Sequence, residues 1–160
     1  MTTWYFTFES PVGLLKLSSD ETHLKSVSFD GEFTENISYI PEILLRTKTQ
    51  LEEYFSGSRQ KFDLPVNPEG TEFQRKVWKH VATVDYGCTR SYVEIACALG
   101  SENFSRAVGM ANGKNPLPII IPCHRIIGHN GKLTGYSGGL ERKKWLLLHE
   151  RQFTDHSRLF

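Results

Sequence analysis

The chain has 160 residues, of which 39% are hydrophobic and 23% charged, and its formal net charge at pH 7 is +1. This length allows one domain or two small ones, and the composition excludes a disordered or fibrous protein. No apolar run approaches the roughly 20 residues of a membrane-spanning helix, and the first residues lack the basic and apolar segments of a signal peptide, so we expect a cytoplasmic protein without membrane contact.

Residues 1–69 have the pattern of a small sheet with a helix. Aromatic and polar residues alternate near the N-terminus, which is the period-2 signature of a half-buried strand. Ile43, Leu44 and Leu51 lie on one face at helical spacing. Residues 67–70, Asn-Pro-Glu-Gly, indicate a linker. The expected elements of this first domain are strands at 4–8, 14–17, 24–29 and 62–66 and a helix from Pro41 to Gly57.

Residues 70–160 change to helical spacing. Thr71 with Gln74, and Ser91 with Glu94, have the spacing of a capping box, in which two side chains satisfy the first N–H groups of a helix. After a short turn at 101–103, a third helix is expected at 104–112. Two helices joined by a tight turn are typical of a helix-turn-helix. The sequence therefore predicts an α+β protein with a mostly helical second domain.

Charge separates the two halves. Residues 1–69 contain 6 Lys and Arg against 11 Asp and Glu, a net −5, whereas residues 70–160 contain 13 against 7, a net +6. Any polyanion is therefore expected to meet the second half. The third predicted helix supports this, because it is rich in small residues and has Arg106 as its one long basic side chain. Its small residues suit either packing against another helix or a close approach to a nucleic-acid groove.

Cys123 is a candidate nucleophile, because His124 and Arg125 follow it inside an apolar run. A cysteine is only a few per cent thiolate at neutral pH, so a base or cation must activate it. His124 could do this if the chain bends after Cys123 and a carboxylate orients the ring. Glu150, Glu94 and Asp85 are the candidate carboxylates, and their spacing does not choose among them. The alternative is that Cys123 is a small, inert core residue, as we expect for Cys88 and Cys97.

Pro122-Cys123-His124-Arg125 resembles the active-site motif of the O6-alkylguanine-DNA alkyltransferases. Other motifs follow in family order over residues 70–150. They are Gly70-Thr71-Glu72-Phe73-Gln74 through Trp78, Ser91-Tyr92, Arg106-Ala107-Val108-Gly109, Asn115-Pro116, Gly135-Tyr136-Ser137-Gly138-Gly139 and Lys143-Lys144-Trp145-Leu146-Leu147.

The resemblance implies a ribonuclease H-like domain at 1–69 and, at 70–160, an alkyl-acceptor domain with a winged helix-turn-helix. Cys123 would accept the alkyl group, His124 would act as its base through a water, and Glu150 would orient His124. Tyr92 would donate a proton to the guanine ring, and Asn115 would brace the third helix. The implied DNA contacts are Arg106, Ser91, Ala107, Gly109 and Arg125, and the implied pocket residues are Tyr92, Ile126, Tyr136, Ser137 and Asn112.

The resemblance also implies a partner and a reaction. The partner would be double-stranded DNA carrying O6-alkylguanine, with O4-alkylthymine as a second substrate, and the damaged nucleotide would be flipped out of the duplex. Transfer would be stoichiometric, because an alkyl group on sulfur is a thioether that water does not remove. We expect a monomer without cofactor or metal, associated with the nucleoid if the source is bacterial. Asn112 stands where some relatives have an apolar residue, which affects the expected tolerance for bulky alkyl groups.

Two other functions fit parts of the pattern. A DNA-binding or regulatory module would use the helix-turn-helix and leave Cys123 buried and inert. A cysteine hydrolase would use Cys123, His124 and an acid, but it would leave the helix-turn-helix without a role.

Overall fold

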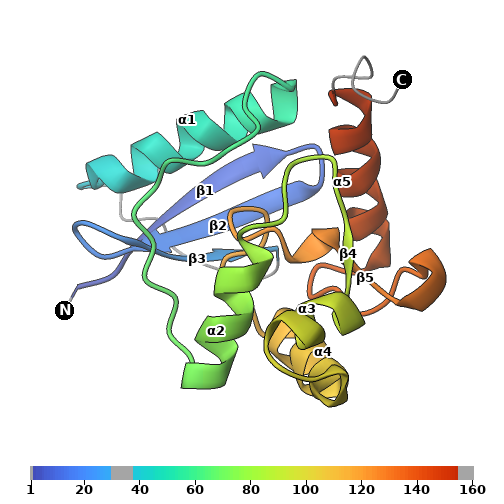
Figure 1. Ribbon diagram of the computed structural model, residues 1–160. Helices are drawn as coiled ribbons and strands as arrows, with labels where there is room; N and C mark the ends of the chain where they lie inside the picture. Colours follow the sequence, from blue (N-terminus) through green and yellow to red (C-terminus); the bar gives the residue numbers. More distant parts are fainter. Residues whose placement is uncertain (1, 30–37, 155–160) are drawn as a thin grey trace. The chain divides into compact units, whose positions relative to one another are not determined.

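The structure is a computed structural model that describes residues 2–29 and 38–154 (Figure 1). The chain forms two compact units. Unit 1 consists of Met1–Gly70 and Pro116–Ile120, and unit 2 consists of Thr71–Asn115 and Ile121–Phe160. The expected α+β arrangement is confirmed, with strands and one helix in unit 1 and mainly helices in unit 2.

Unit 1 is an antiparallel sheet with one helix along one of its faces (Figure 1). The strand order is β1-β2-β3. Phe6 pairs with Leu17 and Phe8 with Leu15, so these four side chains share a face. The ring of Phe8 stacks on Phe55 of the helix at 6.1 Å between centroids. The elements are β1 (Trp4–Ser10), β2 (Gly13–Ser19), β3 (Leu24–Ser28) and α1 (Glu42–Ser56).

The predicted strand at 62–66 is wrong. The structure has only an isolated parallel bridge there, between Leu24 and Val66. Pro65 explains this, because proline has no N–H to donate to a strand ladder. Its carbonyl instead accepts the N–H of Leu24 at 2.9 Å.

A segment distant in the sequence also belongs to unit 1. The sequence-based division at residue 69 places Pro116–Ile120 in the second domain, whereas the structure groups this segment with the sheet. The N–H of Val27 in β3 donates to the carbonyl of Pro116 at 2.9 Å. An edge strand has unpaired backbone groups, and this contact satisfies one of them.

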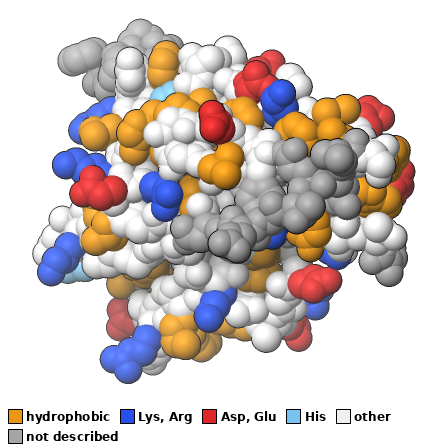
Figure 2. Space-filling view, turned by 180° about the vertical axis from the view of Figure 1, so that it is seen from behind, with side chains coloured by type: hydrophobic (Ala, Val, Ile, Leu, Met, Phe, Trp, Pro, Cys, Tyr) orange, Lys and Arg blue, Asp and Glu red, His pale blue; other side chains and the backbone are white. Residues whose placement is uncertain are grey.

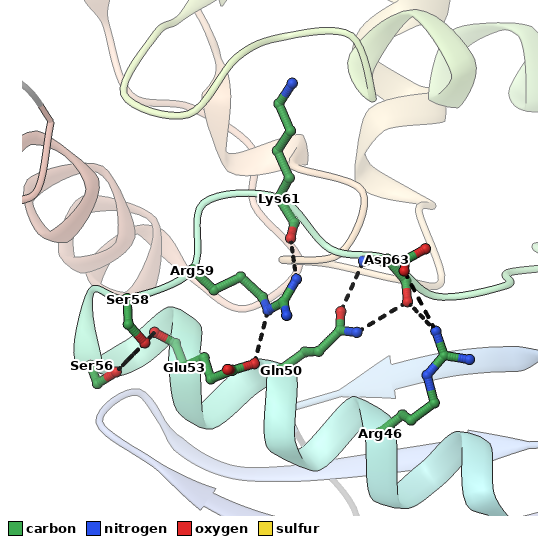
Figure 3. A network of polar contacts seen from close by, with 8 residues as sticks. All are labelled: Arg46, Gln50, Glu53, Ser56, Ser58, Arg59, Lys61 and Asp63. Atoms are coloured by element: carbon green, nitrogen blue, oxygen red, sulfur yellow. Dashed lines mark hydrogen bonds and ion pairs between the residues drawn. The ribbon is translucent and has the colours of Figure 1, made fainter.

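Polar contacts fasten the segment after α1 to that helix (Figure 3). The side-chain amide of Gln50 forms two hydrogen bonds with the backbone of Asp63, accepting its N–H at 2.9 Å and donating to its carbonyl at 3.0 Å. Arg46 donates to the same carbonyl at 2.6 Å. Arg59 bridges Glu53 at 3.0 Å and the carbonyl of Lys61 at 2.8 Å. Gln50 is the buried residue of this network, so water is least able to replace its hydrogen bonds.

Unit 2 contains the helix-turn-helix. Both predicted capping boxes are present, with Thr71 and Gln74 at the first helix and Ser91 and Glu94 at the second. The indole N–H of Trp78 donates to the carbonyl of Ala111 at 2.8 Å, which ties the helix that contains Trp78 to the helix that contains Ala111. The helices are α2 (Glu72–Val81), α3 (Tyr92–Ala98), α4 (Ser105–Gly113) and α5 (Leu140–Gln152), and the short strands β4 (Arg90–Ser91) and β5 (Ile126–Ile127) pair in parallel. Across the described residues, none of the helices has the length and apolar character to span a membrane.

We predict that Gln50→Ala lowers the free energy of unfolding by about 1–3 kcal/mol, because a buried pair of hydrogen bonds is lost. The measurement is urea denaturation followed by circular dichroism. Glu52→Gln is the control, since Glu52 lies on the same helix and contributes only an exposed ion pair to Lys48 at 3.9 Å. That change should cost a few tenths of a kcal/mol. Equal losses in the two variants would contradict the importance of the Gln50 contacts.

Candidate active site

Cys123 begins a buried 3-10 turn, Cys123–Arg125, which lies in the sequence between α4 and α5 of unit 2. The N–H of Arg125 donates to the carbonyl of Pro122 at 2.9 Å, and the N–H of Ile126 donates to that of Cys123. The chain therefore bends after Cys123. The sequence analysis required this bend if His124 is to activate the thiol of Cys123. Cys123 is 2% exposed and His124 is fully buried.

Glu150 is the carboxylate that orients His124. Its Oε2 lies 2.6 Å from Nε2 of His124, and both side chains are buried. Of the other two candidates, Glu94 caps helix α3 and Asp85 is exposed. The backbone N–H of Gly87 adds a further hydrogen bond to Glu150 at 3.2 Å.

Arg125 was expected to contact DNA, and the structure contradicts this. Its side chain is only 7% exposed. The guanidinium donates to both carboxylate oxygens of Glu150, at 2.8 and 3.0 Å, and to the carbonyl of Val84 at 2.7 Å. A buried carboxylate needs a compensating charge, and the residue that follows His124 supplies it. Arg125 is therefore a positioning residue of the site.

These contacts fix the protonation states of the pair. Burial by itself would raise the pKa of Glu150, but His124 and Arg125 outweigh it and hold that pKa far below its usual range. Burial lowers the pKa of His124, against the opposing effect of Glu150. At neutral pH the pair is therefore a carboxylate and a neutral imidazole whose Nε2–H donates to Glu150. The other ring nitrogen, Nδ1, keeps its lone pair and has no hydrogen-bond partner within residues 2–29 and 38–154.

The thiol of Cys123 is protonated at rest. Burial raises its pKa to about 11, while a hydrogen bond from Asn115 and the charge of Lys143 act in the opposite direction. Asn115 also donates from Nδ2 to the carbonyl of Ile121 at 2.9 Å, so it links the end of α4 to the segment that enters the turn. A reaction at this sulfur therefore needs a base that takes the thiol proton.

Lys143 lies at the site, although the sequence analysis quoted it only as part of a motif and gave it no role. It is fully buried in α5, and its ammonium donates at 2.7 Å to each of the carbonyls of Ile126 and Thr134. Burial lowers its pKa to about 8, although its interaction with Cys123 opposes the shift. Helical spacing could have identified it, because Lys143, Leu146 and Glu150 follow at i, i+3 and i+7 on one face.

Most of the expected pocket residues gather around Cys123. Tyr92 donates its hydroxyl to the carbonyl of Thr134 at 3.0 Å, and burial raises its pKa. Asn112 donates from Nδ2 to the carbonyl of Cys123 at 3.1 Å. Burial and the proximity of Cys123 raise the pKa of Tyr136 well above its usual value. Ile126 is buried, whereas Ser137 is exposed.

The expected DNA-contacting residues other than Arg125 lie on the helix-turn-helix. Arg106 and Ala107 are exposed on α4, Gly109 is half-exposed, and Ser91 caps α3. On the molecular face drawn in Figure 2, basic side chains are scattered among acidic and apolar ones. The described part of the chain has no group of three or more His, Cys, Asp or Glu side chains that could hold a metal ion.

We predict that Glu150→Gln lowers the free energy of unfolding at pH 7 by about 3–5 kcal/mol, because Arg125 is left buried without its counter-charge. The low folded-state pKa of Glu150 means that its stabilisation is present above its unfolded pKa of about 4.3 and is lost as the pH falls below that value. The difference between wild type and variant should therefore be constant from pH 7 to 5 and shrink below pH 4. Urea midpoints across this range measure it. Glu141→Gln, an exposed change on the same helix, is the control and should show no such pH dependence.

Known proteins share both units of this chain. Residues 72–152 match the DNA-binding domain of 6-O-methylguanine DNA methyltransferase, and residues 3–68 match its ribonuclease-like domain. A methylated-DNA–protein-cysteine methyltransferase of Methanosarcina acetivorans is 46% identical over 153 residues, which is 90% of this chain and 96% of the relative. The one of Mycolicibacterium paratuberculosis is 45% identical over 161 residues, covering 96% and 95%.

Solved structures of O6-methylguanine methyltransferases also match this chain. The crystal structure of Mycobacterium tuberculosis O6-methylguanine methyltransferase matches with a TM-score of 0.86 at 40% identity, covering 99% of this chain and 100% of that one. A crystal structure of the M. tuberculosis protein in complex with DNA matches with a TM-score of 0.85 at 42% identity over 94% of each chain. The chain belongs to the 6-O-methylguanine DNA methyltransferase family.

Proposed function

We propose that the protein is a methylated-DNA–protein-cysteine methyltransferase that repairs O6-alkylguanine in DNA by moving the alkyl group to the sulfur of Cys123. The proposal rests on a buried network of hydrogen bonds in a protein of this family. Glu150 bonds both Arg125 and His124, and His124 directly follows Cys123 in the same turn. It supplies an oriented neutral imidazole beside a thiol that needs a base.

His124 is the proposed general base. Its Nδ1 would take the thiol proton through one bridging water, and Glu150 would stabilise the imidazolium that forms. The sulfur would then attack the alkyl carbon, forming one S–C bond as the C–O6 bond breaks. Lys143, whose charge favours the ionised sulfur, would stabilise the thiolate during this step.

The departing guanine needs a proton, and Tyr92 is the proposed donor. Its hydroxyl now donates to the carbonyl of Thr134, so it would turn from that carbonyl to the purine ring. In the net reaction, the proton that left the thiol replaces the one that Tyr92 gives to the guanine. The products are a thioether on Cys123 and an unmodified guanine, so atoms and charge balance without a cofactor.

Arg106 is proposed to make the base accessible. A guanine inside a duplex cannot reach a buried sulfur, so its nucleotide must be flipped out at a cost of a few kcal/mol. Arg106 is exposed on α4, and its planar guanidinium would stack in the vacated space. Ser91, Ala107 and Gly109 would lie against the DNA backbone. We also propose that the protein acts in the cytoplasm, a reducing compartment that agrees with its three free cysteines. It is proposed to act as a monomer.

We predict that incubation with duplex DNA containing O6-methylguanine adds one methyl mass to the Cys123 peptide and that the product stops at one equivalent per protein. A thioether has no hydrolytic exit, which is the reason for the plateau. Intact-protein and peptide mass spectrometry measure both. Cys88→Ser and Cys97→Ser, which change exposed cysteines, are the controls and should react normally, whereas Cys123→Ser should not react. Repeated turnover, as in a hydrolase, would refute the proposal.

We predict that Arg106→Ala slows methyl transfer from duplex DNA roughly tenfold or more, because the cost of flipping is no longer offset. Transfer of the methyl group from the free base O6-methylguanine, which needs no flipping, should keep its rate. Single-turnover kinetics on both substrates give the comparison. Arg106→Lys keeps the charge and loses the planar group, so it should resemble Arg106→Ala if stacking matters. Equal losses on duplex and free base would exclude the stacking role.

A further inference from the structure

The carboxylate of Glu150 accepts four hydrogen bonds, three of which come from the turn that contains Cys123. Its Oε2 accepts from Nε2 of His124 at 2.6 Å and from a terminal nitrogen of Arg125 at 3.0 Å. Its Oε1 accepts from Nε of Arg125 at 2.8 Å and from the backbone N–H of Gly87 at 3.2 Å. A carboxylate has about four lone-pair sites, so Gly87 supplies the donor that completes the set.

Gly87 lies in a tight turn whose shape and surroundings both require glycine. The N–H of Cys88 donates to the carbonyl of Asp85 at 3.0 Å, and the φ of Gly87 is +77°. A positive φ at the third residue is typical of a type II turn, where glycine is favoured. A Cβ at residue 87 would also overlap the hydroxyl of Thr154, which donates to the backbone carbonyl of Glu150 at 2.6 Å. A side chain at residue 87 would therefore push the turn away from the end of α5.

Residues 84–87 contact Arg125 as well as Glu150. The carbonyl of Val84 accepts from the guanidinium at 2.7 Å. The guanidinium also lies over the ring of Tyr86, 5.6 Å from its centroid, which is within the range of a cation–π interaction. One segment of four residues thus contacts both members of the ion pair beside the proposed base.

A cavity also borders the Glu150 carboxylate. It has a volume of about 400 Å³, and its lining includes Gly87, Thr89, Leu147 and Glu150. Water in a cavity of this size turns and exchanges, whereas the backbone N–H of a tight turn keeps its direction. The amide of Gly87 therefore fixes Oε1 more firmly than a water molecule in its place would.

We infer that Gly87 is a positioning residue, whose backbone N–H holds the Glu150 carboxylate in the orientation that fixes the ring of His124. The inference rests on the proposed function, in which His124 is the base. Hydrogen bonds to a carboxylate stabilise its charged form, so a Glu150 that loses this donor becomes more basic and binds the imidazolium more strongly. The charged groups that act on His124 are Glu150, Arg125 and Lys143, and only the first would change. Loss of the Gly87 contact should therefore raise the pKa of His124 and leave less neutral base at a given pH.

The first test is Gly87→Ala, whose added Cβ displaces the turn. Single-turnover methyl transfer from duplex O6-methylguanine should slow roughly tenfold at pH 7, because the base is poorly oriented. The ratio of the wild-type rate to the variant rate should increase as the pH falls from 7 to 5, since His124 of the variant takes up its proton at a higher pH. Gly131→Ala is the matched control, because Gly131 has the same φ of +77° but nothing lies within 4 Å of an added Cβ. It should keep the wild-type rate and pH profile.

Removal of the overlap supplies a rescue. Gly87→Ala combined with Thr154→Gly leaves room for the added Cβ, so the turn can return to Glu150 and most of the transfer rate should recover. Thr154→Gly alone should change the rate little. Urea denaturation of each variant measures how much stability the changes cost. Recovery of stability without recovery of the rate would contradict the positioning role.

A further measurement uses the unaltered protein and does not depend on the folding of a variant. The amide resonance of Gly87 should shift with pH at the same midpoint as the acid limb of methyl transfer, because its N–H bonds the partner of His124. The amide of Gly113, at the end of α4, is the control and should not follow this titration. A Gly87 resonance that does not follow it, or a loss in Gly87→Ala that is equal at every pH, would overturn the inference. Absence of methyl transfer by the wild type would instead refute the proposed function itself.

Discussion

The buried carboxylate of Glu150 is the constraint on which the site depends. Removing a carboxylate from water costs several kcal/mol unless charge and hydrogen bonds compensate it. Arg125 and His124 supply both, and they are consecutive residues of the turn that Cys123 begins. The same contacts therefore determine three properties: the position of helix α5 against this turn, the ionisation of Glu150 and the tautomer of His124. A change at any of the three residues would therefore alter the surroundings of the His124 ring, the proposed base.

Burial gives the sulfur two opposite properties. It raises the pKa of Cys123 to about 11, so the resting thiol is a poor nucleophile and is hidden from oxidants. The same low-dielectric surroundings strengthen the effect of Lys143 and of the His124–Glu150 pair once a proton can move. The sulfur therefore becomes a strong nucleophile only when the thiol proton can leave.

Local patterns in the sequence predicted much of this structure. The helix from Pro41 to Gly57, both capping boxes and the helix pair all depend on neighbouring residues, and the structure contains them. Long-range contacts were not accessible in this way. Nothing near Arg125 indicates that Glu150, 25 residues later, neutralises it, and a basic residue was therefore assigned to DNA. Alternation at 62–66 predicted a strand because periodicity does not register the missing N–H of Pro65. Identifying Lys143 as a site residue would have required its position on the buried face of α5, whereas its charge alone suggests an exposed side chain.

Helix α4 carries both the proposed DNA contact and a contact to the backbone of Cys123. Arg106 is exposed and Asn112 is buried, six residues apart on a nine-residue helix. At 100° per residue they lie on different faces, so one rigid element presents a guanidinium outward and an amide to the carbonyl of Cys123. A helix this short is stable only through its packing, and Trp78 and Asn112 provide two of those contacts. In the proposed mechanism, the distance from the opened base stack to the sulfur would thus be set within a single helix.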